Sequence, residues 1–140
     1  PVKDEIFWAT KGGGAFMRKS RLRVSARTDL MEALICYGDG RKEADVLLAH
    51  QLSNLRKAVL TGTRRTGSAA LDLAYVAAGR LDGYWENIIS PWDVAAGWII
   101  VKEAGGIVSD MSGKRDGHHS KSVIAANANL HQPLMDLLHD

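Results

Sequence analysis

Residues 67–86 have the sequence GSAALDLAYVAAGRLDGYWE, and this stretch decides the class of fold. Between the glycines at 67 and 79 lies a run rich in Ala and Leu. Its apolar residues recur at the spacing of one helix face: Leu71, Ala74, Tyr75 and Ala78. The opposite face is apolar as well, so we expect a helix over 68–78 that is buried on two sides. The segment 81–86 then favours a strand.

Further helices and strands alternate on both sides of this stretch. We expect, in chain order, a strand at 34–37, an amphipathic helix at 43–58, an interruption at 62–65, a helix at 93–104, strands at 107–108 and 123–126, and a last helix at 129–138. An alternation of this kind favours an α/β fold with a layered sheet.

The first residues of the chain follow another pattern. A β-favouring run at 6–10, three glycines and an apolar run at 15–17 predict a hairpin. The hairpin does not belong to the alternating order, so we expect residues 1–33 to be the end of an N-terminal α+β domain and residues 34–140 to be a C-terminal α/β domain. The basic run at 18–24, RKSRLRV, fits either an anion-binding patch or a solvated edge strand.

Composition excludes several classes of protein. The chain has 140 residues, of which 46% are apolar and 24% charged, as in ordinary globular domains. The net charge of +2 is too small to argue for nucleic-acid binding by itself. The single cysteine, Cys36, cannot form an internal disulfide and fits a reducing compartment. Without an apolar run of about 18 residues or a signal peptide, we expect a cytoplasmic protein with no membrane partner.

Asp93, in the stretch SPWDVAAG at 90–97, is the first candidate for chemistry. Pro91 favours a helix start and places Asp93 in the first turn, where a carboxylate gains about 0.3–1 kcal/mol from the helix dipole. The alternative is a ligand for a hard cation such as Mg²⁺, which prefers oxygen and shares its coordination with water and phosphate. One carboxylate cannot complete such a site, so partners would be required.

Two other candidates lie in the opening stretch. Ser68 begins the expected helix, where free amides can receive an anion, although an ordinary Ser N-cap has the same spacing. Glu86 ends a strand, a usual place for ligand contacts in α/β folds and also for a solvated carboxylate. The histidines have no zinc spacing, and we expect all of them at the surface: His50, His118, His119, His131 and His139.

Three stretches taken together resemble the inositol monophosphatase family. Residues 67–86 resemble its substrate-binding segment, PWDVAAG at 91–97 resembles its C-terminal signature, and EAGGIVSD at 103–110 follows as it does in the family. Residues 1–23 are similar to the hairpin beyond the family's central motif. The resemblance implies the C-terminal part of the family's α-β-α-β-α layered sandwich, with the last strands of the N-terminal antiparallel sheet.

The resemblance also implies roles for residues. Asp93 matches the family's C-terminal metal ligand, which also contacts substrate. The segment Gly67, Ser68 and Ala69 matches the backbone that contacts substrate, and Glu86 matches the acid that binds a sugar hydroxyl. Ser90 stands where some relatives carry a His. The family's upstream Glu, its Asp-Pro-x-Asp-Gly-Thr motif and an upstream Thr have no counterpart here, so no catalytic residue is expected in this chain.

The function implied is Mg²⁺-dependent hydrolysis of a phosphate monoester, inositol monophosphate to inositol and phosphate, by a homodimer. Because the other metal ligands are missing, we expect this chain to be a fragment that is inactive and poorly soluble alone. Two alternatives remain. One is a related phosphatase acting on fructose 1,6-bisphosphate, histidinol phosphate or 3′-phosphonucleotides. The other is a protein-binding factor in ribosomal RNA transcription complexes, for which the basic run at 18–23 is the only local feature.

Overall fold

The computed structural model describes residues 2–39, 45–115 and 121–140. These residues form a three-stranded sheet, a five-stranded sheet and four α-helices. The expected helix start at Glu43 and the His118–His119 pair lie outside the described residues.

The elements lie close to their predicted positions. They are β1 (Phe7–Thr10), β2 (Gly14–Met17), β3 (Ser20–Arg21), the 3₁₀ helix η1 (Leu30–Glu32), β4 (Ile35–Tyr37), α1 (Asp45–Ala58), β5 (Thr63–Arg64), α2 (Ala69–Ala77), β6 (Gly83–Glu86), α3 (Pro91–Glu103), β7 (Ile107–Ser109), β8 (Val123–Ala126) and α4 (His131–His139). The segment 62–65 is more than an interruption, because it contains the edge strand β5. The basic run contributes only two residues to β3, which is an edge strand as expected.

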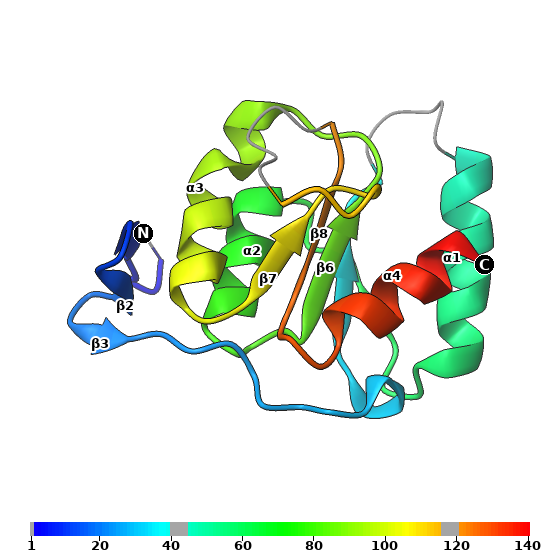
Figure 1. Ribbon diagram of the computed structural model, residues 1–140, viewed down its shortest axis with the longest axis horizontal. Helices are drawn as coiled ribbons and strands as arrows, with labels where there is room; N and C mark the ends of the chain where they lie inside the picture. The colour runs from blue at the N-terminus through cyan, green and yellow to red at the C-terminus, as the bar shows by residue number, and fades with distance from the viewer. Residues whose placement is uncertain (1, 40–44, 116–120) are drawn as a thin grey trace.

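Four layers follow one another across the molecule (Figure 1). The small sheet β1-β2-β3 lies outside α3, the pair α2 and α3 comes next, then the five-stranded sheet, and α1 and α4 cover its opposite face. This arrangement contains successive layers of the expected α-β-α-β-α sandwich. It confirms the α/β class predicted from the alternation of helices and strands.

The five-stranded sheet is mixed, with the order β5-β4-β6-β8-β7. Strand β4 runs parallel to β5 and β6, whereas β8 is antiparallel to both β6 and β7. Successive side chains point to opposite faces. Cys36 and Tyr84 therefore belong to the core under α2 and α3, and Ile35 and Trp85 to the core under α1 and α4.

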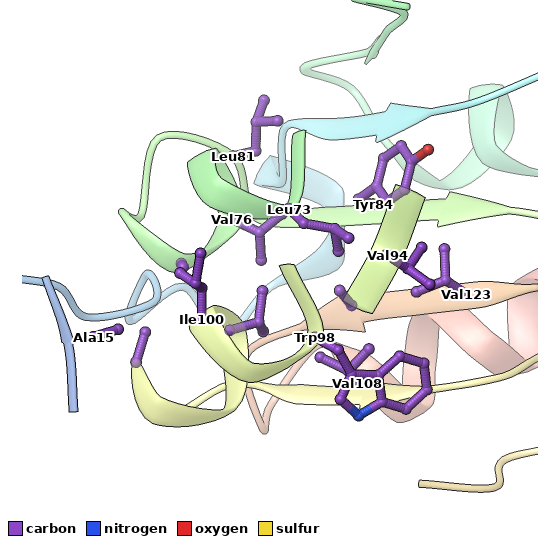
Figure 2. Packing of buried hydrophobic residues seen from close by; sticks show 14 of the residues in the cluster. Ala15, Leu73, Val76, Leu81, Tyr84, Val94, Trp98, Ile100, Val108 and Val123 are labelled. Atoms are coloured by element: carbon purple, nitrogen blue, oxygen red, sulfur yellow. The ribbon is translucent and has the colours of Figure 1, made fainter. Parts of the chain in front are cut away.

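Helices α2 and α3 approach each other closely in the first of these cores. A Cβ added at Gly97 would lie 2.5 Å from Cδ1 of Leu73, so only glycine allows this approach. Figure 2 shows Leu73, Val94 and Trp98 gathered around the contact. As predicted, α2 is buried on two sides, but only from Asp72 to Ala77, because Ala70 and Leu71 in its first turn are exposed.

The small sheet is attached to α3 by a carboxylate. The amides of Gly12 and Gly14 donate to the two oxygens of Glu103, at 2.8 and 2.9 Å, and these hydrogen bonds lower the pKa of Glu103. Ala15 and Leu22 pack in the same core as α2 and α3. The hairpin thus shares a core with the larger unit, and the boundary at residues 33 and 34 stays a prediction.

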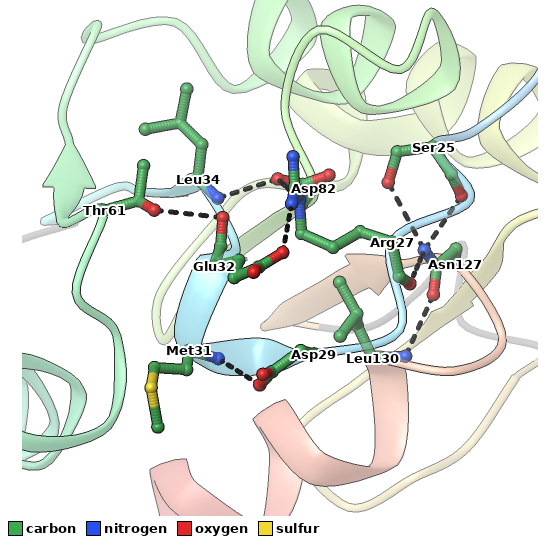
Figure 3. Close-up of polar contacts among 10 residues, drawn as sticks. All are labelled: Ser25, Arg27, Asp29, Met31, Glu32, Leu34, Thr61, Asp82, Asn127 and Leu130. Atoms are coloured by element: carbon green, nitrogen blue, oxygen red, sulfur yellow. Dashed lines mark hydrogen bonds and ion pairs between the residues drawn. The ribbon is translucent and has the colours of Figure 1, made fainter.

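The segment between β3 and β4 is held by polar side chains (Figure 3). Nδ2 of Asn127 donates to the carbonyl oxygens of Ser25 and Arg27, both at 2.8 Å. The Asp82 carboxylate accepts from the amide of Leu34 at 2.8 Å and from Nε of Arg27 at 3.1 Å. These contacts fix the start of β4, and therefore the cavity at its other end.

The expectation of a surface position is wrong for His131. Its side chain is buried at the start of α4, with Nε2 3.0 Å from Oγ of Ser109, and burial lowers its pKa. No helix in the described ranges is both long and apolar enough to cross a membrane.

Candidate functional site

A cavity of about 700 Å³ opens where β4 and β6 end and where α2 and α3 begin. Carboxyl ends of strands and amino ends of helices are the usual walls of ligand sites in α/β folds. The residues singled out from the sequence all line this cavity: Gly67, Ser68, Ala69, Glu86, Ser90 and Asp93. They come from the starts of two helices and the end of one strand, and the fold brings them together.

Asp93 lies in the first turn of α3. Pro91 occupies the first helical position, and the amide of Asp93 donates to the carbonyl oxygen of Ser90 at 3.0 Å. The side chain is exposed and lines the cavity. Both interpretations made from the sequence therefore hold geometrically: Asp93 is a helix-start carboxylate, and it is also available to a ligand in the cavity.

The segment from Gly67 to Ala69 forms the opposite rim. Gly67 has a φ of +89°, a left-handed conformation that favours glycine. Ser68 caps α2, because its Oγ accepts from the amide of Leu71 at 3.4 Å. The first amides of α2 thus face the region where an anion or a hydroxyl could bind.

Glu86 is held on the cavity floor by its neighbours. The hydroxyl of Tyr84 donates to Oε2 of Glu86, and a Cβ at Gly38 would lie 2.1 Å from the same oxygen. A larger residue at 38 would therefore displace the Glu86 carboxylate from this position. Burial, followed by the contact with Glu86, raises the pKa of Tyr84, so the phenol remains a donor across the physiological range.

The sequence did not single out several cavity residues. Asp39 and Arg65 form an ion pair at 2.5 Å on the rim, and Lys121 is exposed nearby. Asp72 lies beneath the rim with no exposed surface, and its Oδ1 accepts from the hydroxyl of Thr66 at 2.7 Å. One signal was present in the sequence: Asp72 is the only charged residue within an otherwise apolar helix, one turn after Ser68.

The cavity is lined by carboxylate oxygens, which are the chemical type of ligand that magnesium binds. Asp93 and Glu86 offer carboxylates, the ligands that Mg²⁺ prefers. Within the part of the chain that the structure describes, no three His, Cys, Asp or Glu side chains come together as a metal-binding group. Asp93 therefore fits as one ligand of a magnesium site that needs others.

The chain is thus an α/β layered domain with a polar cavity where two helices start. Residues 1–140 match the model of the inositol monophosphatase family. The chain belongs to this family.

The chain is similar to proteins of two descriptions. It is 47% identical to an inositol-1-monophosphatase of Mesorhizobium japonicum over 96% of this chain and 51% of the relative. It is 40% identical to the Nus factor SuhB of Pseudomonas aeruginosa, again over 96% of this chain and 51% of the relative. The chain thus spans about half the length of these curated relatives, which is consistent with the predicted C-terminal portion.

Solved structures agree with the fold. The extragenic suppressor protein suhB of Bartonella henselae superposes with a TM-score of 0.93 at 44% identity, over 99% of this chain and 54% of that one. Inositol monophosphatase from Anabaena gives a TM-score of 0.91 at 37% identity, over 99% of this chain and 56% of that one.

Proposed function

We propose that this chain supplies one wall of the active site of a Mg²⁺-dependent phosphate monoester hydrolase, with inositol monophosphate as substrate. One observation carries the proposal: Asp93, Glu86 and the segment from Gly67 to Ala69 line one cavity although they lie on three separate elements. Membership of the inositol monophosphatase family and the similarity to an inositol-1-monophosphatase support the same reaction class.

In this proposal Asp93 holds one Mg²⁺. The metal supplies positive charge that neutralises the phosphate and the leaving oxygen. The amides of Ala69 and Ala70, in the first turn of α2, receive oxygens of the ester, because a helix start favours negative charge. Glu86 accepts a hydrogen bond from a hydroxyl of the alcohol, and Tyr84 keeps this carboxylate in place.

The remaining metal ligands and the group that directs the attacking water are not assigned to this chain. We therefore propose that it acts as part of a longer, cytoplasmic and homodimeric protein, divided near residue 33, and that these 140 residues alone are inactive. Phosphate release from inositol monophosphate, measured with and without Mg²⁺, tests this directly. Release by the isolated chain would contradict it.

The test of the site is Asp93→Asn in the complete protein. We expect a loss of at least about a hundredfold in kcat/KM, partly recovered at high Mg²⁺, because the amide keeps the shape but loses the charge. Asp136→Asn is the matched control, since Asp136 is an exposed helical carboxylate of α4 outside the cavity. Near-normal turnover in Asp93→Asn would reduce Asp93 to a helix-start carboxylate.

A second function, protein binding in transcription complexes, is favoured by the relatives described as Nus factor SuhB. The basic run offers exposed cations, although Arg18 is paired with Asp4. Co-purification with transcription factors that survives Asp93→Asn would establish this role independently of hydrolysis. A substrate panel that includes fructose 1,6-bisphosphate, histidinol phosphate and 3′-phosphonucleotides would decide the specificity.

A further inference from the structure

We propose that Asp72 is a positioning residue, which anchors the rim segment from Gly67 to Ala69 through the hydroxyl of Thr66. The inference deepens the proposed function, because that rim is the part of the cavity assigned to the substrate. Asp72 itself is buried beneath the rim, so its role is to hold the segment in place.

Two hydrogen bonds connect Asp72 to the rim through Thr66. Oγ1 of Thr66 donates to Oδ1 of Asp72 at 2.7 Å, and Oγ1 of Thr66 also accepts from the amide of Ser68 at 3.4 Å. The amide of Asp72 also donates to the carbonyl oxygen of Ser68, at 2.9 Å. Thr66 and Ser68 flank Gly67, whose left-handed conformation needs support from its neighbours because glycine has the most backbone freedom.

The second oxygen of Asp72 distinguishes this carboxyl group from an ordinary helix-start carboxylate. Oδ2 is buried and has no hydrogen-bond partner of full geometry among the described residues, and the Cys36 thiol, a weak donor, is the other side chain that stabilises this carboxylate. A carboxylate that served only the helix dipole could remain at the solvated surface, where it avoids the cost of losing its hydration. Asp72 instead lies with no exposed surface against a cavity wall, a position that costs stability and that the rim contact explains.

Cys36 and Tyr84 lie close enough to Asp72 to influence one another electrostatically. Burial raises the pKa of Asp72, and hydrogen bonding to the side chains of Thr66 and Cys36 opposes this rise. Asp72 in turn contributes to the raised pKa of Tyr84, the residue that holds Glu86. Asp72 and Tyr84 therefore connect the rim segment to the Glu86 carboxylate beneath the cavity.

Thr66→Val and Thr66→Ser form the decisive pair of variants, made in the complete protein. Valine keeps the shape and removes the donor, whereas serine keeps the donor. We expect Thr66→Val to speed amide hydrogen exchange over residues 66–71 and to raise KM for inositol monophosphate, each about three- to tenfold, as for the loss of one hydrogen bond. The value of kcat should stay within about twofold, and Thr66→Ser should behave as the native protein.

Asp72 is tested from the other side of the same hydrogen bond. Asp72→Asn keeps an acceptor for Thr66 and should preserve both readouts, whereas Asp72→Ala should match Thr66→Val. The double variant of Thr66→Val and Asp72→Ala should change no more than the larger single variant, because both remove one contact. Thr61→Val is the matched control: it removes a Thr hydroxyl that donates to the Glu32 carbonyl at 3.0 Å, outside the cavity.

Any of three results would overturn the proposal. Thr66→Val could show the same hydrogen exchange and the same KM as Thr61→Val, or Thr66→Ser could change both quantities as much as Thr66→Val does. Hydrogen exchange in Thr66→Val could also become faster evenly over the whole protein. The hydrogen-exchange measurement does not depend on catalysis. If the native protein releases no phosphate from inositol monophosphate, the proposed function fails, and exchange at residues 66–71 still decides whether Asp72 anchors the rim.

Discussion

Two buried polar groups on opposite faces of the five-stranded sheet are treated differently. On the α1 side, Gln51 is completely buried and all its hydrogen-bonding groups are used. Its Nε2 donates to Asn87 and to the carbonyl of Leu138, both at 3.2 Å, and its Oε1 accepts from Trp85 at 3.2 Å and from Asn87 at 2.7 Å. On the cavity side, Asp72 is equally buried, but its Oδ2 has no partner of full hydrogen-bond geometry among the described residues, and the weak thiol donor of Cys36 compensates only in part.

We attribute this difference in hydrogen bonding to position: Gln51 stabilises the core, whereas Asp72 lies at the proposed site. Satisfied buried networks stabilise a fold and specify its packing, whereas an unsatisfied oxygen costs about 1–3 kcal/mol. The Gln51 network joins α1, α4 and the strand β6 in the core away from the cavity. The Asp72 carboxyl lies beneath the rim segment from Gly67 to Ala69, so its unfavourable burial is located at the proposed site.

Gln51→Ala should have the largest effect. It would leave the indole N–H of Trp85 without its acceptor and create a void among α1, α4 and β6, so we expect a loss of about 3–5 kcal/mol in the free energy of unfolding. Urea denaturation of the complete protein measures this loss. Gln132→Ala is the matched control, because Gln132 is exposed on α4 and should change stability by less than about 0.5 kcal/mol. A similar small loss in Gln51→Ala would remove the distinction between the two faces.

The elements could be predicted from the sequence because helix and strand spacing is local. Gly67, Gly79 and Pro91 mark real boundaries of α2 and α3. Spacing is less accurate for the amphipathic helix expected at 43–58: the helix is present as α1, but its apolar residues Val46 and Leu47 are exposed. The buried Gln51 on that helix was not identified, because its partners are 34 or more residues away along the chain.

In the candidate site, too, some residues could be predicted from the sequence and others could not. Asp93, Glu86 and the segment from Gly67 to Ala69 were identified because the resemblance to a family covers them. Asp72 was not, because its burial and its contact with Thr66 depend on how α2 packs against β4 and β6. His131 was misassigned for a related reason: its partner Ser109 is on β7, and no local pattern indicates that pairing.

Tyr84→Phe should have an intermediate effect, and mainly on the site. The change removes the hydroxyl that holds Glu86 and leaves the aromatic packing, so we expect KM for inositol monophosphate to rise about three- to tenfold and stability to fall by about 1 kcal/mol. Tyr75→Phe is the control, since Tyr75 lies on α2 away from the cavity lining and packs against Phe7. An equal change in KM for both variants would show that Tyr84 acts through packing alone.

The smallest effect should come from the buried His131, and it should depend on pH. Burial lowers its pKa below 6.5, so the folded protein resists protonation where the unfolded chain accepts it. Its contribution to stability is therefore complete above pH 6.5 and decreases as the pH falls below that value. Arg115 adds to the effect through its charge, whereas the hydrogen bond to the Ile124 backbone opposes it.

Unfolding of the native protein and of His131→Gln at pH 7.5 and 5.5 measures this contribution. The variant should be less stable at pH 7.5, because Ser109 loses one of its two hydrogen-bond partners, and should lose less stability on acidification than the native protein. His139→Gln, an exposed change at the other end of α4, should keep the native pH dependence. A buried group whose contribution to stability falls on acidification would then be a third case, between the fully paired Gln51 and the incompletely paired Asp72.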